Sequence, residues 1–192
     1  MMRTTKWTAA QLRELCPVDV CERRYYRSVN FIDLYEDPNH VKKRPVSRKR
    51  LGQMDLERTG VGYFREGRLI RLDDRDPLLP VETYLLWENG LVREAHSFMM
   101  GYRYNERSPM RRLDPPQRWD SFWYTYDEAG RMLQSLWLNY ADVTYGLHDE
   151  REVRLAYTYD EKGLLLVRKT VTGPAFDAPM CAVMYDREKK DS

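Results

Sequence analysis

Four acidic residues stand in two adjacent pairs, and paired carboxyl groups suit hydrolytic chemistry. Asp127 and Glu128 form one pair, and Asp160 and Glu161 form the other. Two carboxyl groups in one site can divide the roles of general acid and general base between them. Each pair, however, directly precedes a glycine turn, where an Asp accepts hydrogen bonds from the turn backbone and a Glu points into solvent. We therefore expect no catalytic residue in either pair.

His148 is the one histidine with acidic neighbours, Asp149 and Glu150. A histidine beside a carboxylate can act as a base, but this cluster is expected to lie in a surface loop. The sequence contains no Gly-x-Ser-x-Gly, Walker or His-Glu-x-x-His motif. The chain is therefore predicted to act without catalysis.

Three cysteines could hold a metal or form a disulfide: Cys16, Cys21 and Cys181. The four residues between Cys16 and Cys21 do not match the usual spacing of a zinc half-site, and the histidines are isolated from one another. An odd number of cysteines without a secretion signal favours reduced thiols. We predict no metal site and no cofactor.

Six cations fall within nine residues: Lys42, Lys43, Arg44, Arg48, Lys49 and Arg50. Two prolines and the lack of periodicity predict an irregular loop over residues 37–50. Such a loop can contact an acidic protein, or it can neutralise phosphates and give nucleic-acid binding a steep salt dependence. Because the loop has no aromatic residue for base stacking, a protein partner is favoured and nucleic acid is the alternative.

The elements that position these groups are predicted to be β-hairpins. A glycine recurs four residues after an apolar or aromatic residue and two before an aliphatic one, at Gly67, Gly90, Gly130 and Gly163. This spacing predicts three-residue loops in which the glycine has a positive φ, with Asp127 and Asp160 fixing the entry. The predicted register places Tyr126 opposite Met132, Tyr124 opposite Gln134, Tyr159 opposite Leu165 and Tyr157 opposite Val167.

The predicted register gives the last two hairpins a core face and a polar face. The core face contains Phe122, Tyr124, Tyr126, Met132, Leu136, Leu155, Tyr157, Tyr159, Leu165 and Val167. The polar face also carries the indoles of Trp119, Trp123 and Trp137, and Trp87 has the equivalent place in the second hairpin. Because exposed Trp residues are frequent binding hot spots, these four are predicted to contact a partner. The alternative is that the N-terminal helix or a loop covers them.

The flanking segments contain clear start and stop signals. Thr8 to Gln11 reads as a capping box, and Pro17 ends the helix that follows at Cys16. The segment 25–35 fits both helical and strand spacing, and a strand from about Ser28 is favoured. Breaker residues predict loops at 73–77, 108–116 and 173–179. Residues 180–185 are predicted to form a final strand.

Two of the hairpins resemble the tyrosine-aspartate (YD) repeats of Rhs and teneurin-type proteins. Residues 124–132 and 157–165 follow the pattern Tyr-x-Tyr-Asp-x-x-Gly, although Met132 and Leu164 depart from the Arg-Leu ending of the repeat. The resemblance covers about a third of the chain and implies an array of hairpins rather than a large shell. Small proteins with such hairpins are familiar as immunity partners of polymorphic toxins, including those of Rhs proteins. The resemblance therefore implies a toxin-binding immunity protein and transfers no catalytic residue.

The 192-residue length fits one domain, with a helical segment at 1–24, a strand and the basic loop at 25–50, a hairpin array at 51–186 and a disordered tail at 187–192. No run approaches the roughly 20 apolar residues that span a bilayer, and a cytoplasmic location is expected. We predict a mainly β fold, an antiparallel meander of about eight to ten strands with a short N-terminal α-helix. Its expected function is to block a cognate toxin by occlusion.

Overall fold

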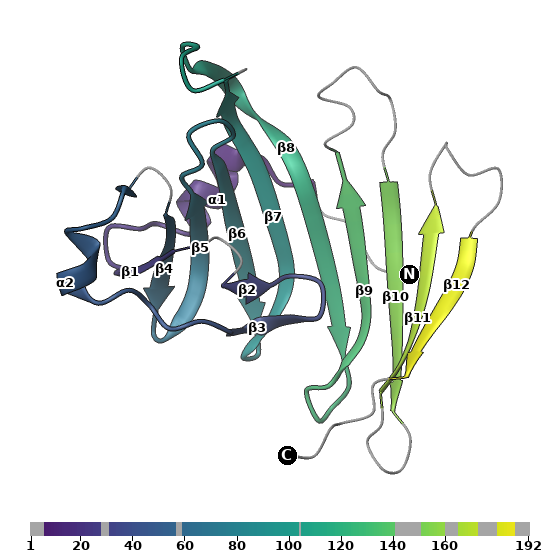
Figure 1. The fold of residues 1–192 in the computed structure, drawn as a ribbon. Coiled ribbons are helices and arrows are strands. Elements are labelled where there is room, and N and C mark those ends of the chain that lie inside the picture. Colours follow the sequence, from purple (N-terminus) through teal and green to yellow (C-terminus); the bar gives the residue numbers. More distant parts are fainter. Residues whose placement is uncertain are drawn as a thin grey trace. The chain divides into compact units, whose positions relative to one another are not determined.

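A computed structural model describes residues 6–27, 31–56, 59–103, 105–140, 151–159, 165–172 and 180–186, the last two ranges as backbone. The chain is mainly β, with antiparallel strands and a short helix near the N-terminus, which confirms the predicted fold class (Figure 1). It divides into two compact units, residues 1–119 and 120–192, and each is described by itself. The interpretation as a single domain stays a prediction.

Helix α1 (Ala9–Leu15) begins and ends where the sequence indicates. The Thr8 hydroxyl accepts a hydrogen bond from the Gln11 backbone N–H at 3.2 Å, and the Gln11 side chain accepts one from the Thr8 N–H at 2.9 Å. This reciprocal capping box satisfies two donors at the helix start. Cys16 caps the other end directly before Pro17.

The first unit is built on an antiparallel sheet with the strand order β1-β4-β5-β6-β7. The strands are β1 (Glu22–Tyr26), β4 (Gly60–Arg65), β5 (Arg68–Asp74), β6 (Val81–Glu88) and β7 (Leu91–Tyr102). Strand β8 (Arg111–Tyr126) begins in the first unit and continues into the second. The predicted loop over 108–116 is therefore wrong from Arg111 onward.

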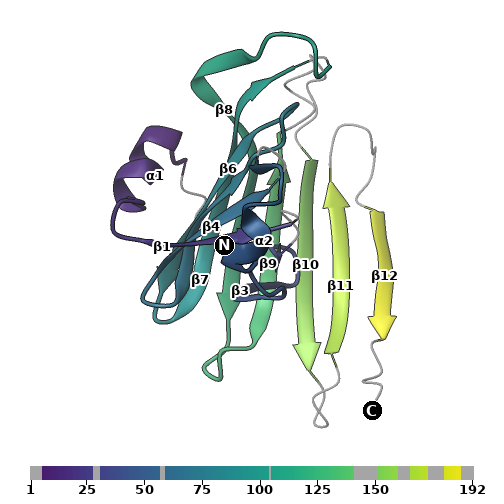
Figure 2. The same ribbon diagram turned by 60° about the vertical axis from the view of Figure 1, so that its left-hand side comes forward.

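Different elements cover the two faces of the first unit's sheet (Figure 2). On one face, Ala9, Leu12 and Cys16 of α1 pack against Ile70, Tyr84 and Phe98 of the sheet. On the other lies a hairpin of β2 (Ile32–Asp33) and β3 (Asp37–Val41), whose Asn39 side chain accepts a hydrogen bond from the Val92 N–H at 2.8 Å. A Cβ at Gly62 would lie 3.3 Å from the Phe31 ring, so the glycine lets that ring approach the sheet.

The turns of the first two hairpins differ from the predicted three-residue loops. In the β4–β5 turn both Glu66 and Gly67 have positive φ values, 51° and 78°, and in the β6–β7 turn Asn89 and Gly90 have 51° and 83°. Two consecutive residues of positive φ make a two-residue type I′ loop, whose twist matches that of the strands. The prediction failed because it placed the positive φ on the glycine alone.

The second unit contains the end of β8 and the strands β9 (Met132–Asn139), β10 (Arg151–Tyr159), β11 (Leu165–Thr172) and β12 (Met180–Asp186), in that order. The β8–β9 turn is the predicted three-residue loop, with Gly130 at φ 78°. The Asp127 side chain accepts a hydrogen bond from the Arg131 N–H at 2.8 Å. The Met180–Tyr185 prediction is confirmed by β12.

Tyr126 pairs with Met132, Tyr159 with Leu165 and Tyr157 with Val167, as predicted. Tyr124 pairs with Ser135 instead of Gln134, because Leu133 is an extra residue that forms a β-bulge. The bulge turns the following residues of β9 to the opposite face, since successive side chains alternate. Trp137 therefore pairs with Phe122, and Leu136 pairs with Trp123.

The described residues between 22 and 51 contain more regular secondary structure than predicted. The strand expected from Ser28 begins outside the described residues, and within its range residues 32–33 form β2, while β1 precedes it. Residues 37–41 of the expected irregular loop form β3. The basic run ends in the one-turn helix α2 (Arg48–Leu51). The expected 173–179 loop and 187–192 tail lie outside the described residues.

Candidate binding surface

The basic segment 42–50 is tied to the sheet by backbone hydrogen bonds. The Lys42 N–H donates to the Phe31 carbonyl, and the Val46 N–H donates to the Tyr25 carbonyl of β1, each at 2.7 Å. At its end, the N–H groups of Arg50 and Leu51 bond to the Ser47 carbonyl. The segment is therefore anchored at Val46 to β1, the edge strand of the first unit's sheet, and at Lys42 to Phe31, directly before β2.

Lys42 differs from the other cations of this segment because it has an acidic partner. Its Nζ lies 2.8 Å from Asp33 Oδ2, and this hydrogen bond raises the pKa of Lys42. Burial tends to raise the pKa of Asp33. The hydrogen bonds from Lys42 and from the Glu36 and Tyr35 N–H groups outweigh burial, so the pKa of Asp33 is lowered. Lys42 thus fastens the segment to β2 and is already neutralised.

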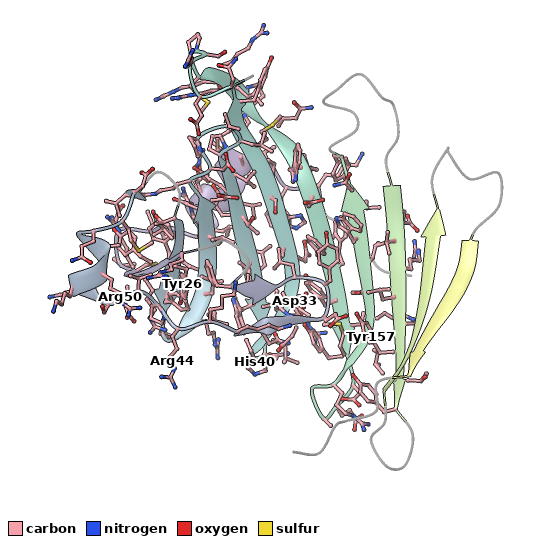
Figure 3. All side chains as sticks on the ribbon, viewed as in Figure 1. Tyr26, Asp33, His40, Arg44, Arg50 and Tyr157 are labelled. Atoms are coloured by element: carbon pink, nitrogen blue, oxygen red, sulfur yellow. The ribbon has the colours of Figure 1, made fainter. Side chains whose placement is uncertain are left out.

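The remaining cations of the segment are exposed and unpaired. Within the described residues no ion pair or side-chain hydrogen bond neutralises them, and Arg27 at the end of β1 shares this state. Figure 3 shows Arg44 and Arg50 projecting away from the ribbon. We call this surface the basic edge, and it consists of Arg27, Lys43, Arg44, Arg48, Lys49 and Arg50.

The four predicted indoles do not form one exposed patch. Trp87 packs against the α1 core, and its indole N–H donates to the Leu69 carbonyl at 2.8 Å. Trp123 is buried, with 4% of its surface exposed. Trp137 is half-buried and donates to Asp120 Oδ1 at 2.7 Å, and Trp119 is half-buried.

Trp87 fits the alternative prediction, in which the N-terminal helix covers the indole. Trp123 is almost fully buried. The Leu133 bulge places Trp137 on the face of the strands opposite to Trp123. Contact roles for Trp119 and Trp137, which are both half-buried, stay predictions. The four indoles therefore do not share one exposed surface.

A half-buried polar cluster beside α1 is the main feature that the sequence did not indicate. Arg71 Nε lies 2.6 Å from Asp73 Oδ1, and Arg71 Nη2 lies 2.9 Å from Glu82 Oε1. Arg13 of α1 reaches Glu82 at 3.1 Å, and the Tyr84 hydroxyl donates to the same carboxylate. Burial tends to lower the pKa of Arg71, but the neighbouring Asp73 and Glu82 outweigh burial and raise this pKa. Fully paired charges of this kind join the helix to the sheet.

The other predicted site residues have structural surroundings or lie outside the described residues. Cys16 and Cys21 are free thiols, and burial raises the pKa of Cys16 to about 11. In the described part of the chain, no three His, Cys, Asp or Glu side chains are grouped to hold a metal. Asp160, Gly163, the His148 cluster and Cys181's side chain are not described.

No α-helix of the described residues has the length and apolar character to cross a bilayer. Comparison with protein-family models finds no matching family, and searches of curated proteins and of solved structures find no significant match. The basic edge is therefore defined by its geometry alone.

Proposed function

We propose that this protein acts without catalysis by binding an acidic protein through the basic edge. The most concrete candidate is a cytoplasmic immunity protein that occludes a cognate toxin, with the basic edge covering an anionic surface of that toxin. The observation that carries the proposal is that the six cations of the basic edge are exposed and have no acidic partners among the described residues. Charges of this kind steer association with a complementary partner and discriminate against partners of like charge.

The anchoring of the basic edge supports a role in recognition. A segment held at Lys42 and Val46 by backbone hydrogen bonds loses less conformational freedom on binding than a free loop does. The helix α2 orders three of the cations, Arg48, Lys49 and Arg50.

The distribution of charge over the chain also supports an acidic partner. Residues 1–119 contain 23 basic and 17 acidic residues, a net charge of +6, whereas residues 120–192 contain 9 basic and 13 acidic residues, a net charge of −4. The small total of +2 therefore conceals a basic first unit. Because exposed charges act mainly within a Debye length of roughly 8–10 Å, a partner at the basic edge senses this local charge.

The immunity assignment rests on the YD-like hairpins. The β8–β9 hairpin has the three-residue loop, the positive φ at Gly130 and the Asp127 hydrogen bonds that the repeat pattern predicts. This agreement supports a hairpin array, and the step from such an array to toxin binding is an analogy.

The test is co-expression with the product of the adjacent gene, followed by size-exclusion chromatography with light scattering. We expect a stoichiometric complex that Lys43→Glu with Arg44→Glu weakens at least tenfold. The matched control is Lys6→Glu with Arg107→Glu, two exposed cations outside the basic edge, which changes the net charge equally. A complex that both double variants weaken to the same degree contradicts a role for the basic edge.

Nucleic acid is the second occupant that six clustered cations fit. Titration of single- and double-stranded DNA and RNA at low salt separates the two proposals. Binding that falls steeply with salt and is lost in the Lys43→Glu, Arg44→Glu variant, without any complex with the adjacent gene product, assigns the basic edge to nucleic acid.

A further inference from the structure

A pocket of about 780 Å³ lies in the first unit, and it shares no residue with the basic edge. It is framed by the connection from β5 to β6, by the end of β7 and by the start of β8, while Arg13 of α1 borders it. Pockets of this size are typical of small-molecule sites.

Most acidic groups that line the pocket are already engaged. Asp73 is paired with Arg71, and Glu82 is paired with both Arg71 and Arg13. Asp76 accepts hydrogen bonds from the backbone N–H groups of residues 78 and 79 at 2.7 and 3.2 Å. Ion pairs neutralise Asp73 and Glu82. Backbone hydrogen bonds hold Asp76 in the wall, and also Asp74, which accepts one from the Asp76 N–H at 2.9 Å, but they do not neutralise these two carboxyl groups.

Two arginines that line the pocket, by contrast, lack an acidic partner among the described residues. The Nε of Arg103 is buried and has no hydrogen-bond partner, and within the described residues no acid pairs with Arg103 or Arg112. The buried Nε of Arg103 is closed to a ligand, so an anion in the pocket would bond to the terminal Nη groups of Arg103 and Arg112, whose charge no acid among the described residues neutralises. The guanidinium geometry matches a carboxylate or a phosphate in a two-point contact.

The remaining lining is largely apolar. Leu56, Val81, Met100, Met110 and Leu113 face the same space as the two arginines. Aliphatic and thioether side chains bind an apolar body by burying its surface, and flexible methionines adapt to its shape.

We propose that this pocket binds a small organic anion, a carboxylate or a phosphate monoester joined to an apolar body. The anionic group bonds to Arg103 and Arg112, and the apolar body lies against the methionine and leucine side chains. Asp114, which also lines the pocket and is exposed, opposes the anion through its own charge.

The test uses anilinonaphthalene sulfonate, a fluorescent organic anion with an apolar ring system, as the probe. We expect one probe molecule per chain, and a dissociation constant that rises about tenfold or more in Arg103→Gln, because one charge-assisted contact is lost. Arg112→Gln is also expected to raise the dissociation constant of the probe. Because Arg112 is exposed, this substitution is expected to preserve the fold. Asp114→Asn is expected to tighten binding. Circular dichroism checks that each variant is folded.

The control variant is Arg107→Gln, which removes an exposed cation four residues from Arg103 that does not line the pocket. The control ligand is phenylnaphthylamine, which has the rings without the sulfonate. Displacement of the probe by benzoate or by phenyl phosphate distinguishes a carboxylate site from a phosphate site. The proposal is overturned if Arg103→Gln and Arg112→Gln bind the probe as the Arg107 control does, or if the uncharged ligand binds equally well.

Discussion

His96 has no exposed surface, and it hydrogen-bonds to a carboxylate. Its Nε2 lies 2.9 Å from Glu94 Oε2, which also accepts the Trp7 indole N–H at 2.9 Å. Burial lowers the pKa of His96 and the nearby Arg118 adds to this effect, whereas Glu94 opposes it. His96 is therefore neutral in the folded protein under conditions in which an exposed histidine begins to take up a proton.

This lowered pKa makes stability depend on pH in a defined direction. The unfolded chain binds a proton at His96 near pH 6.5, about the ordinary pKa, while the folded chain binds it only at lower pH. The stabilisation by neutral His96 is therefore complete above about pH 6.5 and is lost as the pH falls toward the folded pKa.

We expect the free energy of unfolding, measured by urea denaturation from about pH 5 to pH 7, to rise with pH. His96→Gln, which has no titrating group, should rise less over the same range. Equal slopes for both proteins would show that His96 does not titrate in this way.

At the scale of elements, α1 is held to the sheet by one buried face. Leu12 has no exposed surface, whereas Leu15 in the same helix is 50% exposed. The hydrogen bond from Trp7 to Glu94 and the ion pair from Arg13 to Glu82 flank this apolar contact. Helices this short depend on tertiary packing for their stability.

We expect Leu12→Ala to lower the free energy of unfolding by about 2–5 kcal/mol, because it leaves a cavity in the core. Leu15→Ala is the matched control, and a change within about 0.5 kcal/mol is expected for it, as for other surface substitutions. Equal effects in denaturant unfolding would mean that α1 does not dock through Leu12.

The sequence predicts the hairpins because their signal is local. The recurring glycine marks each turn, and the Thr8 capping box with Pro17 marks α1. In three hairpins a bulge falls three residues after the glycine, at Ile70, Arg93 and Leu133. These residues share no chemical type, so the sequence pattern does not reveal the bulges, and each one moves later side chains to the other face.

The candidate site shows the same division between local and distant information. The exposed cations of the basic edge are visible as a run in the sequence, since charges without nearby acids stay in solvent. Their anchoring through Phe31 and Tyr25 depends on pairing between distant segments. The pocket arginines, Arg103 and Arg112, line one pocket from the end of β7 and the start of β8, and no motif marks them.

At the scale of the whole molecule, the two compact units share a strand. Strand β8 runs without interruption from Arg111 to Tyr126, across the boundary between Trp119 and Asp120. Separate domains are ordinarily joined by exposed, flexible linkers. A continuous strand at the boundary instead favours units that unfold together.

We therefore expect a single thermal transition in differential scanning calorimetry, with equal calorimetric and van't Hoff enthalpies. One core variant in each unit makes the test specific: Leu12→Ala in α1, and Val153→Ala at a buried position of β10. Each truncation removes buried apolar contacts, so each should lower the midpoint of the same transition. Two transitions, with Leu12→Ala shifting one and Val153→Ala the other, would show that residues 1–119 and 120–192 unfold independently and that β8 does not couple them.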